Sequence, residues 1–410
     1  MERLNDDRSV NFVNELPYDV LITILSSLTT EDLVDFTPHV QQLRLQLPSL
    51  SNWYNTPLTR IAQGLFPRLE VLQLNALHLQ NTDTLMLALG EVANTLKELL
   101  LTTEHNPNAV FIPLCTVLSI CHKLKHFIYT HDAETETSLA FGQMPTHTLQ
   151  LTDFNFSIYY PEEHIDSTMA TLLQHCTHLQ RLTLTCNDGD EVLPAIQQHC
   201  KQLEYLRLHD ILNYQARPST ITSGDCAQSD PDPPSSLNLH SVTILRTRGC
   251  ADIMIPYLAR STETLTELYI NLRPIAVPTW DPLLTWGLPN LRCLTLSYGE
   301  VDNNGFVADL ITHLPLLEEV HLEECEYIGL HVFNALAQLD NLKSLSIDGV
   351  IGAEEDSLAD MFLTFSQRGV DGPLKSVTFD MCHDFIDTYD VLQSLADVES
   401  VQEIGYAIVP

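Results

Sequence analysis

The sequence predicts an α/β solenoid, in which short strands and helices alternate along the chain and stack on one another. Three observations support this fold class. A pattern of apolar residues, apolar-x-x-apolar-x-apolar, recurs along most of the 410 residues. In its most regular part the copies begin at Leu239, Leu265, Leu291, Leu317 and Leu342, in steps of 26, 26, 26 and 25 residues. The intervals between copies carry apolar residues at helical spacing.

Each copy predicts one strand, because apolar and variable positions alternate within it. Each interval predicts one helix; Val307, Leu310, Ile311 and Leu314 lie on a single helical face. The clear copies begin at Leu69, Leu96, Leu124, Leu179, Leu203, Leu239, Leu265, Leu291, Leu317, Leu342 and Leu374, and weaker ones begin at Val40, Thr146 and Val401.

A single strand–helix unit cannot bury its leucines alone, whereas stacked units share one core. Leucine-rich repeats have a period of about 20–29 residues, which includes the steps seen here. The alternative, a compact α/β domain with leucine-rich strands, would not keep this period. We therefore expect a leucine-rich-repeat solenoid over residues 39–410, a horseshoe with parallel strands on the concave side and helices on the convex side. Residues 213–237, rich in Pro, Ser and Asp, are expected to form a mobile insertion, either a plain loop or a regulatory one.

Residues 12–38 form a separate region, preceded by a polar segment, 1–11, that we expect to be disordered. Pro17 suits the first position of a helix, where its missing N–H costs nothing. Apolar residues from Val20 to Leu28 follow helical spacing, and a second short helix begins near Thr29 and ends before Pro38. The region is therefore expected to be helical.

Together the two regions resemble F-box proteins with cysteine-containing leucine-rich repeats. Leu16-Pro17, an amphipathic helix, a polar turn and the pair Asp32-Leu33 resemble the first half of an F-box. Cysteines beside the strands, such as Cys121, Cys176 and Cys200, resemble the cysteines of that repeat type. The box is shorter than usual, since the first repeat begins at about residue 40. Residues 12–38 could instead simply cap the end of the solenoid.

The resemblance implies a substrate-recognition subunit of a Skp–cullin–F-box type ubiquitin ligase. Its partners would be a Skp-type adaptor, the cullin ligase complex and an unknown target protein. In that family apolar side chains of the box enter a groove of the adaptor. The matching adaptor-binding candidates are Leu16, Pro17, Val20, Leu21, Ile24, Leu25, Leu28, Leu33 and Val34.

Target binding is expected on the strand residues that point away from the core, including Thr185 and Asn271. Against a net charge of −34, Arg181 and Arg207 are distinctive, and we expect them to lie close together and to contact an acidic or phosphorylated target side chain. Alternatively, both arginines pair with carboxylates of the chain itself. The target-binding candidates are Arg181, Thr183, Tyr205, Arg207, His209, Tyr269 and His321.

The strong negative charge makes nucleic acid and anionic membrane surfaces poor partners. The sequence has neither a signal-peptide pattern nor an apolar run of membrane-spanning length, so we expect an intracellular protein of the cytoplasm or nucleus. It also lacks a nucleotide-binding or hydrolase motif and a pair-of-pairs spacing of Cys and His for zinc. We therefore expect no catalytic residue, cofactor or metal site. The alternatives are a repeat scaffold without ligase association and, third, an enzyme.

Overall fold

The computed structural model describes residues 40–46, 55–75, 82–103, 112–131, 141–158, 165–186, 191–210, 239–245, 255, 257–272, 280–297, 303–325, 327–350, 352–380 and 389–407. The chain divides into two compact units, Met1–Thr185 and Cys186–Pro410, and each has its own description below. The polar segment 1–11, the F-box-like region 12–38 with all nine adaptor-binding candidates, and the insertion 213–237 lie outside the described residues.

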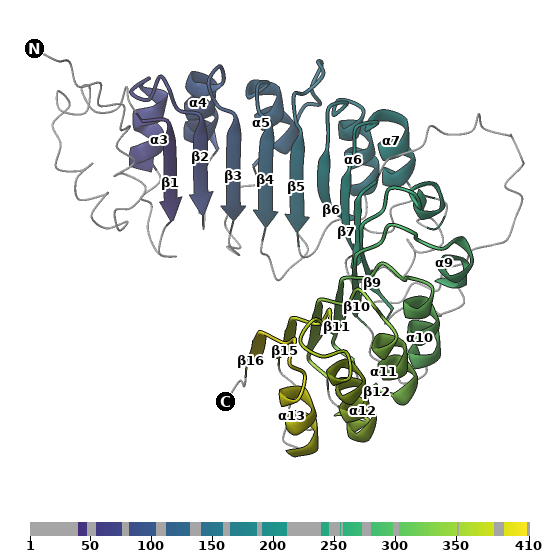
Figure 1. Ribbon diagram of the computed structural model, residues 1–410. Helices are drawn as coiled ribbons and strands as arrows, with labels where there is room; N and C mark the ends of the chain where they lie inside the picture. Colours follow the sequence, from purple (N-terminus) through teal and green to yellow (C-terminus); the bar gives the residue numbers. More distant parts are fainter. Residues whose placement is uncertain are drawn as a thin grey trace, which may run out of the picture. The chain divides into compact units, whose positions relative to one another are not determined.

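The first unit contains a parallel sheet whose described strands pair in chain order (Figure 1). Along the chain a helix lies between most successive strands, and α3, α4 and α5 lie against one face of the sheet. The strands are β1 (Gln42–Gln46), β2 (Val71–Asn75), β3 (Glu98–Thr103), β4 (His126–His131), β5 (Asp153–Ile158) and β6 (Arg181–Cys186). The helices are α3 (Asn55–Ala62), α4 (Asp83–Val92), α5 (Leu114–Ile120) and α6 (Ile165–Leu173).

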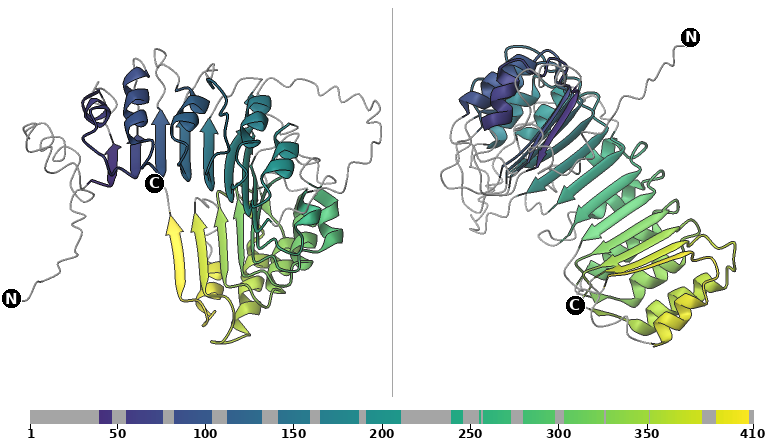
Figure 2. Two further views of the ribbon diagram at one scale, coloured as in Figure 1. Left: turned by 90° about the horizontal axis from the view of Figure 1, so that it is seen from above. Right: turned by 90° about the vertical axis from the view of Figure 1, so that its left-hand side faces the viewer.

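The second unit repeats this arrangement, with helices along one face of a parallel sheet (Figure 2). Its strands are β7 (Tyr205–Asp210), β8 (Ser241–Leu245), β9 (Glu267–Asn271), β10 (Cys293–Ser297), β11 (Glu319–Glu323), β13 (Ser344–Asp348), β15 (Ser376–Asp380) and β16 (Glu403–Ala407). Its helices are α7 (Val192–His199), α9 (Asp281–Trp286), α10 (Asn304–Thr312), α11 (Leu330–Ala337), α12 (Glu355–Ser366) and α13 (Tyr389–Ala396). A separate short pair joins β12 (Tyr327–Ile328) to β14 (Gly352–Ala353).

The core of each unit lies between the sheet and its helices. The parallel register pairs Leu294 of β10 with Leu268 of β9 and with Val320 of β11, and all three side chains are buried. Buried residues at equal positions of successive strands therefore form continuous ladders. This alternation of parallel strand and helix agrees with a leucine-rich-repeat-like fold. Whether the two units form a single arc stays a prediction.

Every clear copy of the apolar pattern coincides with a strand, and the weak copies at Val40 and Val401 form β1 and β16. The copy expected at Thr146 is wrong, because Thr146 lies in an irregular, exposed segment. The true copy is Leu151-x-x-Phe154-x-Phe156, whose strand is β5. All three of these side chains are buried, and Phe156 stacks on Tyr129 of β4 with ring centroids 5.6 Å apart. The copies then begin at 124, 151 and 179, in steps of 27 and 28 residues.

Within the described part of the chain, every helix is too short or too polar to cross a lipid bilayer.

Candidate functional site

The sheet of the second unit presents a polar surface on the side away from its core. We call this surface the outward face and define it by the alternate residues of β9, β10, β11, β13 and β15 on the side of the sheet away from the core; Asn271 and Ser297 among them are buried. The parallel register places these residues in three rows across the strands. The first row is Glu267, Cys293, Glu319, Ser344 and Ser376; the second is Tyr269, Thr295, His321, Ser346 and Thr378; the third is Asn271, Ser297, Glu323, Asp348 and Asp380.

The outward face carries negative charge. Among its defining strands no position is Lys or Arg, whereas five of the fifteen outward positions are Asp or Glu. Burial raises the pKa of Asp348 above its ordinary value, and the nearby carboxylates of Asp380, Glu323 and Glu324 raise it further. Because like charges crowd together here, a cationic group placed on this surface would relieve their repulsion.

Tyr269 connects separate strands of this face. Its hydroxyl donates a hydrogen bond to Oε2 of Glu323 at 2.8 Å, and so it reaches from β9 across β10 to β11. Burial raises the pKa of Tyr269, and the hydrogen bond to Glu323 raises it further. Tyr269 is therefore held as a neutral hydrogen-bond donor to Glu323.

Two residues expected to point outward at the ends of strands are buried instead. Thr185 is 3% exposed, and its hydroxyl accepts a hydrogen bond from the backbone N–H of Ile158 at 3.1 Å. Asn271 is 2% exposed, and its amide donates to the hydroxyl of Ser297 at 3.5 Å. At these positions the chain leaves the sheet, and small polar side chains bond to the neighbouring strand rather than to solvent. Neither residue is available to a partner.

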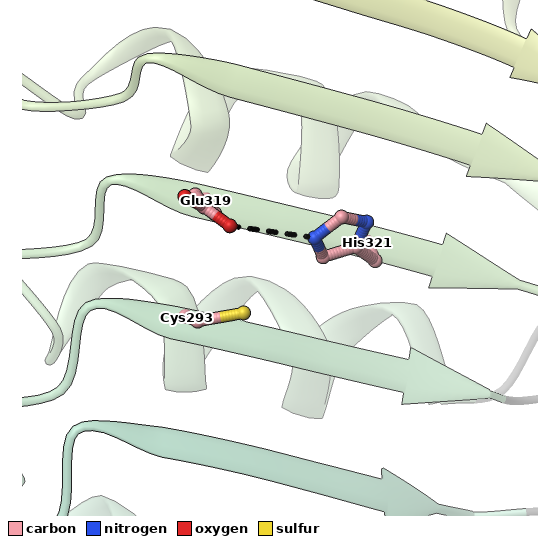
Figure 3. Close-up of side chains that lie close together, drawn as sticks. All are labelled: Cys293, Glu319 and His321. Atoms are coloured by element: carbon pink, nitrogen blue, oxygen red, sulfur yellow. Dashed lines mark ion pairs between the residues drawn. The ribbon is translucent and has the colours of Figure 1, made fainter. Parts of the chain in front are cut away.

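Three side chains with different donor atoms meet on the outward face (Figure 3). Cys293 on β10 is the register partner of Glu319 on β11, and His321 lies two residues further along the same strand. The thiol sulfur, a carboxylate oxygen and a ring nitrogen all lie within 4.8 Å of one another. His321 Nε2 lies 3.9 Å from Glu319 Oε2. We call these residues the Cys-Glu-His cluster.

The cysteine of this cluster is a protonated thiol near neutral pH. Burial raises the pKa of Cys293 to about 11, and the carboxylates of Glu319 and Glu267, on the two flanking strands, also raise it. Thiol sulfur, imidazole nitrogen and carboxylate oxygen are the donor types that bind zinc in proteins. No metal site was expected from the sequence, because its Cys and His residues lack a pair-of-pairs spacing. Cys293 and Glu319 are 26 residues apart, which equals the repeat period, and this spacing was the signal in the sequence that could have revealed the cluster.

Five of the target-binding candidates lie on two strands, one in each unit. Arg181 and Thr183 belong to β6, in the first unit, and the Arg181 side chain is exposed. Tyr205, Arg207 and His209 belong to β7, in the second unit, where Arg207 is exposed. Because the proposed Arg181–Arg207 neighbourhood joins the two units, it stays a prediction. Tyr269 and His321 lie in the same row of the outward face, on either side of Thr295.

These features define the class of the protein as a strand–helix repeat protein with a polar strand surface. No protein-family model matches the sequence, and no curated protein matches it. One solved structure with a similar chain is the crystal structure of the Rad7 and Elc1 complex in yeast. The similarity covers 88% of this chain and 86% of that chain, with 14% sequence identity and a TM-score of 0.41. A similarity at that level carries no conclusion about the function of this chain.

Proposed function

We propose that this protein is the substrate-recognition subunit of a Skp–cullin–F-box type ubiquitin ligase and that its repeats bind the target protein. The observation that carries the proposal is that one chain combines an F-box-like region with a repeat array. The region that contains Leu16-Pro17 resembles an F-box, and the repeats that follow it in the sequence have a polar strand surface. The chain would contribute positioning: a target held beside the conjugating enzyme reacts as if the transfer were intramolecular. Such a role needs no catalytic residue of its own.

The outward face is the proposed target-binding surface of the second unit. Its carboxylates, among them Glu319, Glu323 and Asp348, favour a target segment that is rich in Lys and Arg. Charge complementarity of this kind speeds association and rejects partners of the wrong charge. Arg181 and Arg207 would in turn contact an acidic or phosphorylated group of the target.

The adaptor link is tested with the purified full-length chain and a purified Skp-type adaptor. Leu16→Asp and Leu21→Asp should each weaken adaptor binding by about 30-fold or more, because each places a charge where an apolar anchor would enter the groove. Binding is measured by surface plasmon resonance or by co-elution in size-exclusion chromatography. Leu87→Asp is the matched control: Leu87 on α4 is 66% exposed, and its replacement should leave adaptor binding unchanged.

The second candidate function is a repeat scaffold without ligase association, which the short length of the F-box-like region favours. Under this alternative, residues 12–38 only cap the repeats. The unmodified chain would then fail to bind the adaptor, or Leu16→Asp, Leu21→Asp and Leu87→Asp would all bind it equally well. Either result rejects the ligase proposal and leaves target binding by the repeats open to a separate measurement.

A further inference from the structure

We propose that Cys293, Glu319 and His321 bind one Zn²⁺ ion on the outward face of the second unit, with the fourth coordination position open to an exchangeable ligand. The inference concerns the repeat surface itself and does not depend on a link to a ligase.

The first support is geometric. Register fixes Cys293 and Glu319 side by side on paired strands, and the pleat returns His321 to the same face two residues later. The three donor atoms already lie within 4.8 Å of one another. Zinc–ligand bonds are about 2.0–2.3 Å long, so two ligands of one ion are separated by roughly 3–4 Å. Small rotations of these three partly accessible side chains are therefore enough to bring the cluster to binding geometry.

The second support is the choice of donors. Calcium and magnesium prefer oxygen ligands, whereas a set of sulfur, nitrogen and oxygen suits zinc. Three protein ligands with one open position is the arrangement of zinc sites that exchange their fourth ligand. The His321 side chain is 33% exposed and that of Glu319 54% exposed, so water or a side chain of a bound protein can reach the ion.

The third support is electrostatic. Glu267 pairs with Cys293 from β9, opposite Glu319 on β11, so a carboxylate flanks the thiol on each side. The negative potential of these two carboxylates attracts a dication, and binding of the ion releases the thiol proton. On the described strands of this face no Lys or Arg competes for the position.

The residues beside His321, and beside Glu319 on the β13 side, are small. The cross-strand partners of His321 are Thr295 on β10 and Ser346 on β13, and the next residue in the first row after Glu319 is Ser344. Short side chains at these positions leave the imidazole and the carboxylate free to turn toward a shared ion.

The test uses the purified full-length chain, freed of metal with a chelator and titrated with Co²⁺. Cobalt takes the place of zinc and gives a near-ultraviolet thiolate-to-cobalt absorption band if a cysteine is a ligand. We expect the band to saturate at one equivalent of Co²⁺ per chain and Zn²⁺ to displace the bound Co²⁺. Cys293→Ser should abolish the band. Glu319→Gln and His321→Ala should each weaken Zn²⁺ binding at least about tenfold, since loss of even an outer-shell partner typically costs 10- to 100-fold.

His126→Ala is the matched control. His126 Nδ1 lies 3.9 Å from Asp153 Oδ2 on paired strands of the first unit, a similar histidine–carboxylate pair without a cysteine. This variant should keep the full cobalt band and the unmodified affinity for Zn²⁺. Circular dichroism establishes that each variant is folded, and His321→Ala provides an independent test if Cys293→Ser is unstable.

The proposal is overturned if the chain binds no Co²⁺ or if the band persists unchanged in Cys293→Ser. It is also overturned if Glu319→Gln and His321→Ala bind Zn²⁺ as tightly as the unmodified chain, or if His126→Ala lowers the affinity as much as they do.

Discussion

At the scale of single residues, three of the described cysteines illustrate two different environments. Cys121 and Cys200 follow α5 and α7, where their backbone N–H groups donate to carbonyls of the last helical turn. Both side chains are buried, and burial raises the pKa of each thiol to about 12. These cysteines behave as small apolar residues at the ends of helices. Cys293 differs because it lies on the outward face beside two carboxylates.

Arg368 is a second residue whose role follows from its contacts. Its guanidinium donates hydrogen bonds to the carbonyls of Leu339 and Ala337, both at 2.7 Å, and lies 4.9 Å from the ring centroid of Phe365. These carbonyls lie at and just beyond the end of α11, where helical partners run out and the dipole favours a cation. A single side chain thus joins the ends of α11 and α12.

Arg368→Ala should therefore lower the free energy of unfolding by about 1.5–3 kcal/mol, the range for hydrogen bonds to a charged group. The measurement is urea denaturation of the full-length chain followed by circular dichroism. Arg60→Ala is the control, because Arg60 makes one exposed 3.4 Å hydrogen bond to Gln63, and it should change stability by no more than about 0.5 kcal/mol. Equal effects of the two substitutions would contradict the role given to Arg368.

At the scale of elements, the aromatic residues of β4 and β5 form the core of their repeats. Phe127 stacks on Phe154 with centroids 6.0 Å apart, and Tyr129 stacks on Phe156 at 5.6 Å. All four rings are buried. Aromatic residues here occupy the positions that leucine holds in most other copies, so the repeats keep their strand register with larger core side chains.

Phe156→Ala should destabilise the chain by about 3–5 kcal/mol, because it removes a fully buried ring and leaves a cavity. Thermal or urea unfolding of the full-length chain measures the effect. Thr146→Ala tests the rejected register: Thr146 is exposed, and its replacement should shift stability by no more than about 0.5 kcal/mol. A large loss at Thr146 together with a small one at Phe156 would mean that β5 is wrongly placed.

At the scale of the whole molecule, the chain carries a large excess of negative charge. Asp and Glu number 54 against 20 Lys and Arg, a net charge of −34. Repeats stack on their neighbours, and stability is the sum of many similar interfaces. Repulsion among carboxylates on adjacent repeats therefore opposes folding along the entire chain.

Added salt should raise the melting temperature of this protein. The Debye length falls from about 30 Å at 0.01 M salt to about 10 Å at 0.1 M. Repulsion between the carboxylates of neighbouring repeats therefore weakens as salt is added. Each kcal/mol of repulsion removed should raise the melting temperature of a chain of 410 residues by about 1 °C. Scanning calorimetry from 0.01 to about 0.3 M NaCl measures the change, and KCl should have the same effect. A constant or falling melting temperature would show that self-repulsion does not limit stability.

The sequence alone determined where nearly all the strands lie. Buried leucines of successive repeats must lie side by side in the core. The period of the pattern in the sequence therefore gives the positions of the strands. Only the copy predicted at Thr146 was wrong. The strand of that repeat, β5, buries Phe154 and Phe156, whereas Leu149 and Leu151, just before it, imitate the pattern. The repeat pattern also did not predict the burial of Thr185 and Asn271, because the alternation of apolar and polar residues does not show where a strand ends.

Tertiary structure alone decided which outward side chains meet. Cys293 and Glu319 are distant in sequence, and only the pairing of β10 with β11 brings them together. The bond from Tyr269 to Glu323 likewise spans 54 residues. Burial of apolar residues constrains the inward positions strongly, because misplacing one costs a core contact. Outward positions carry no such constraint, so their chemistry emerges only once the register and the side-chain directions are known.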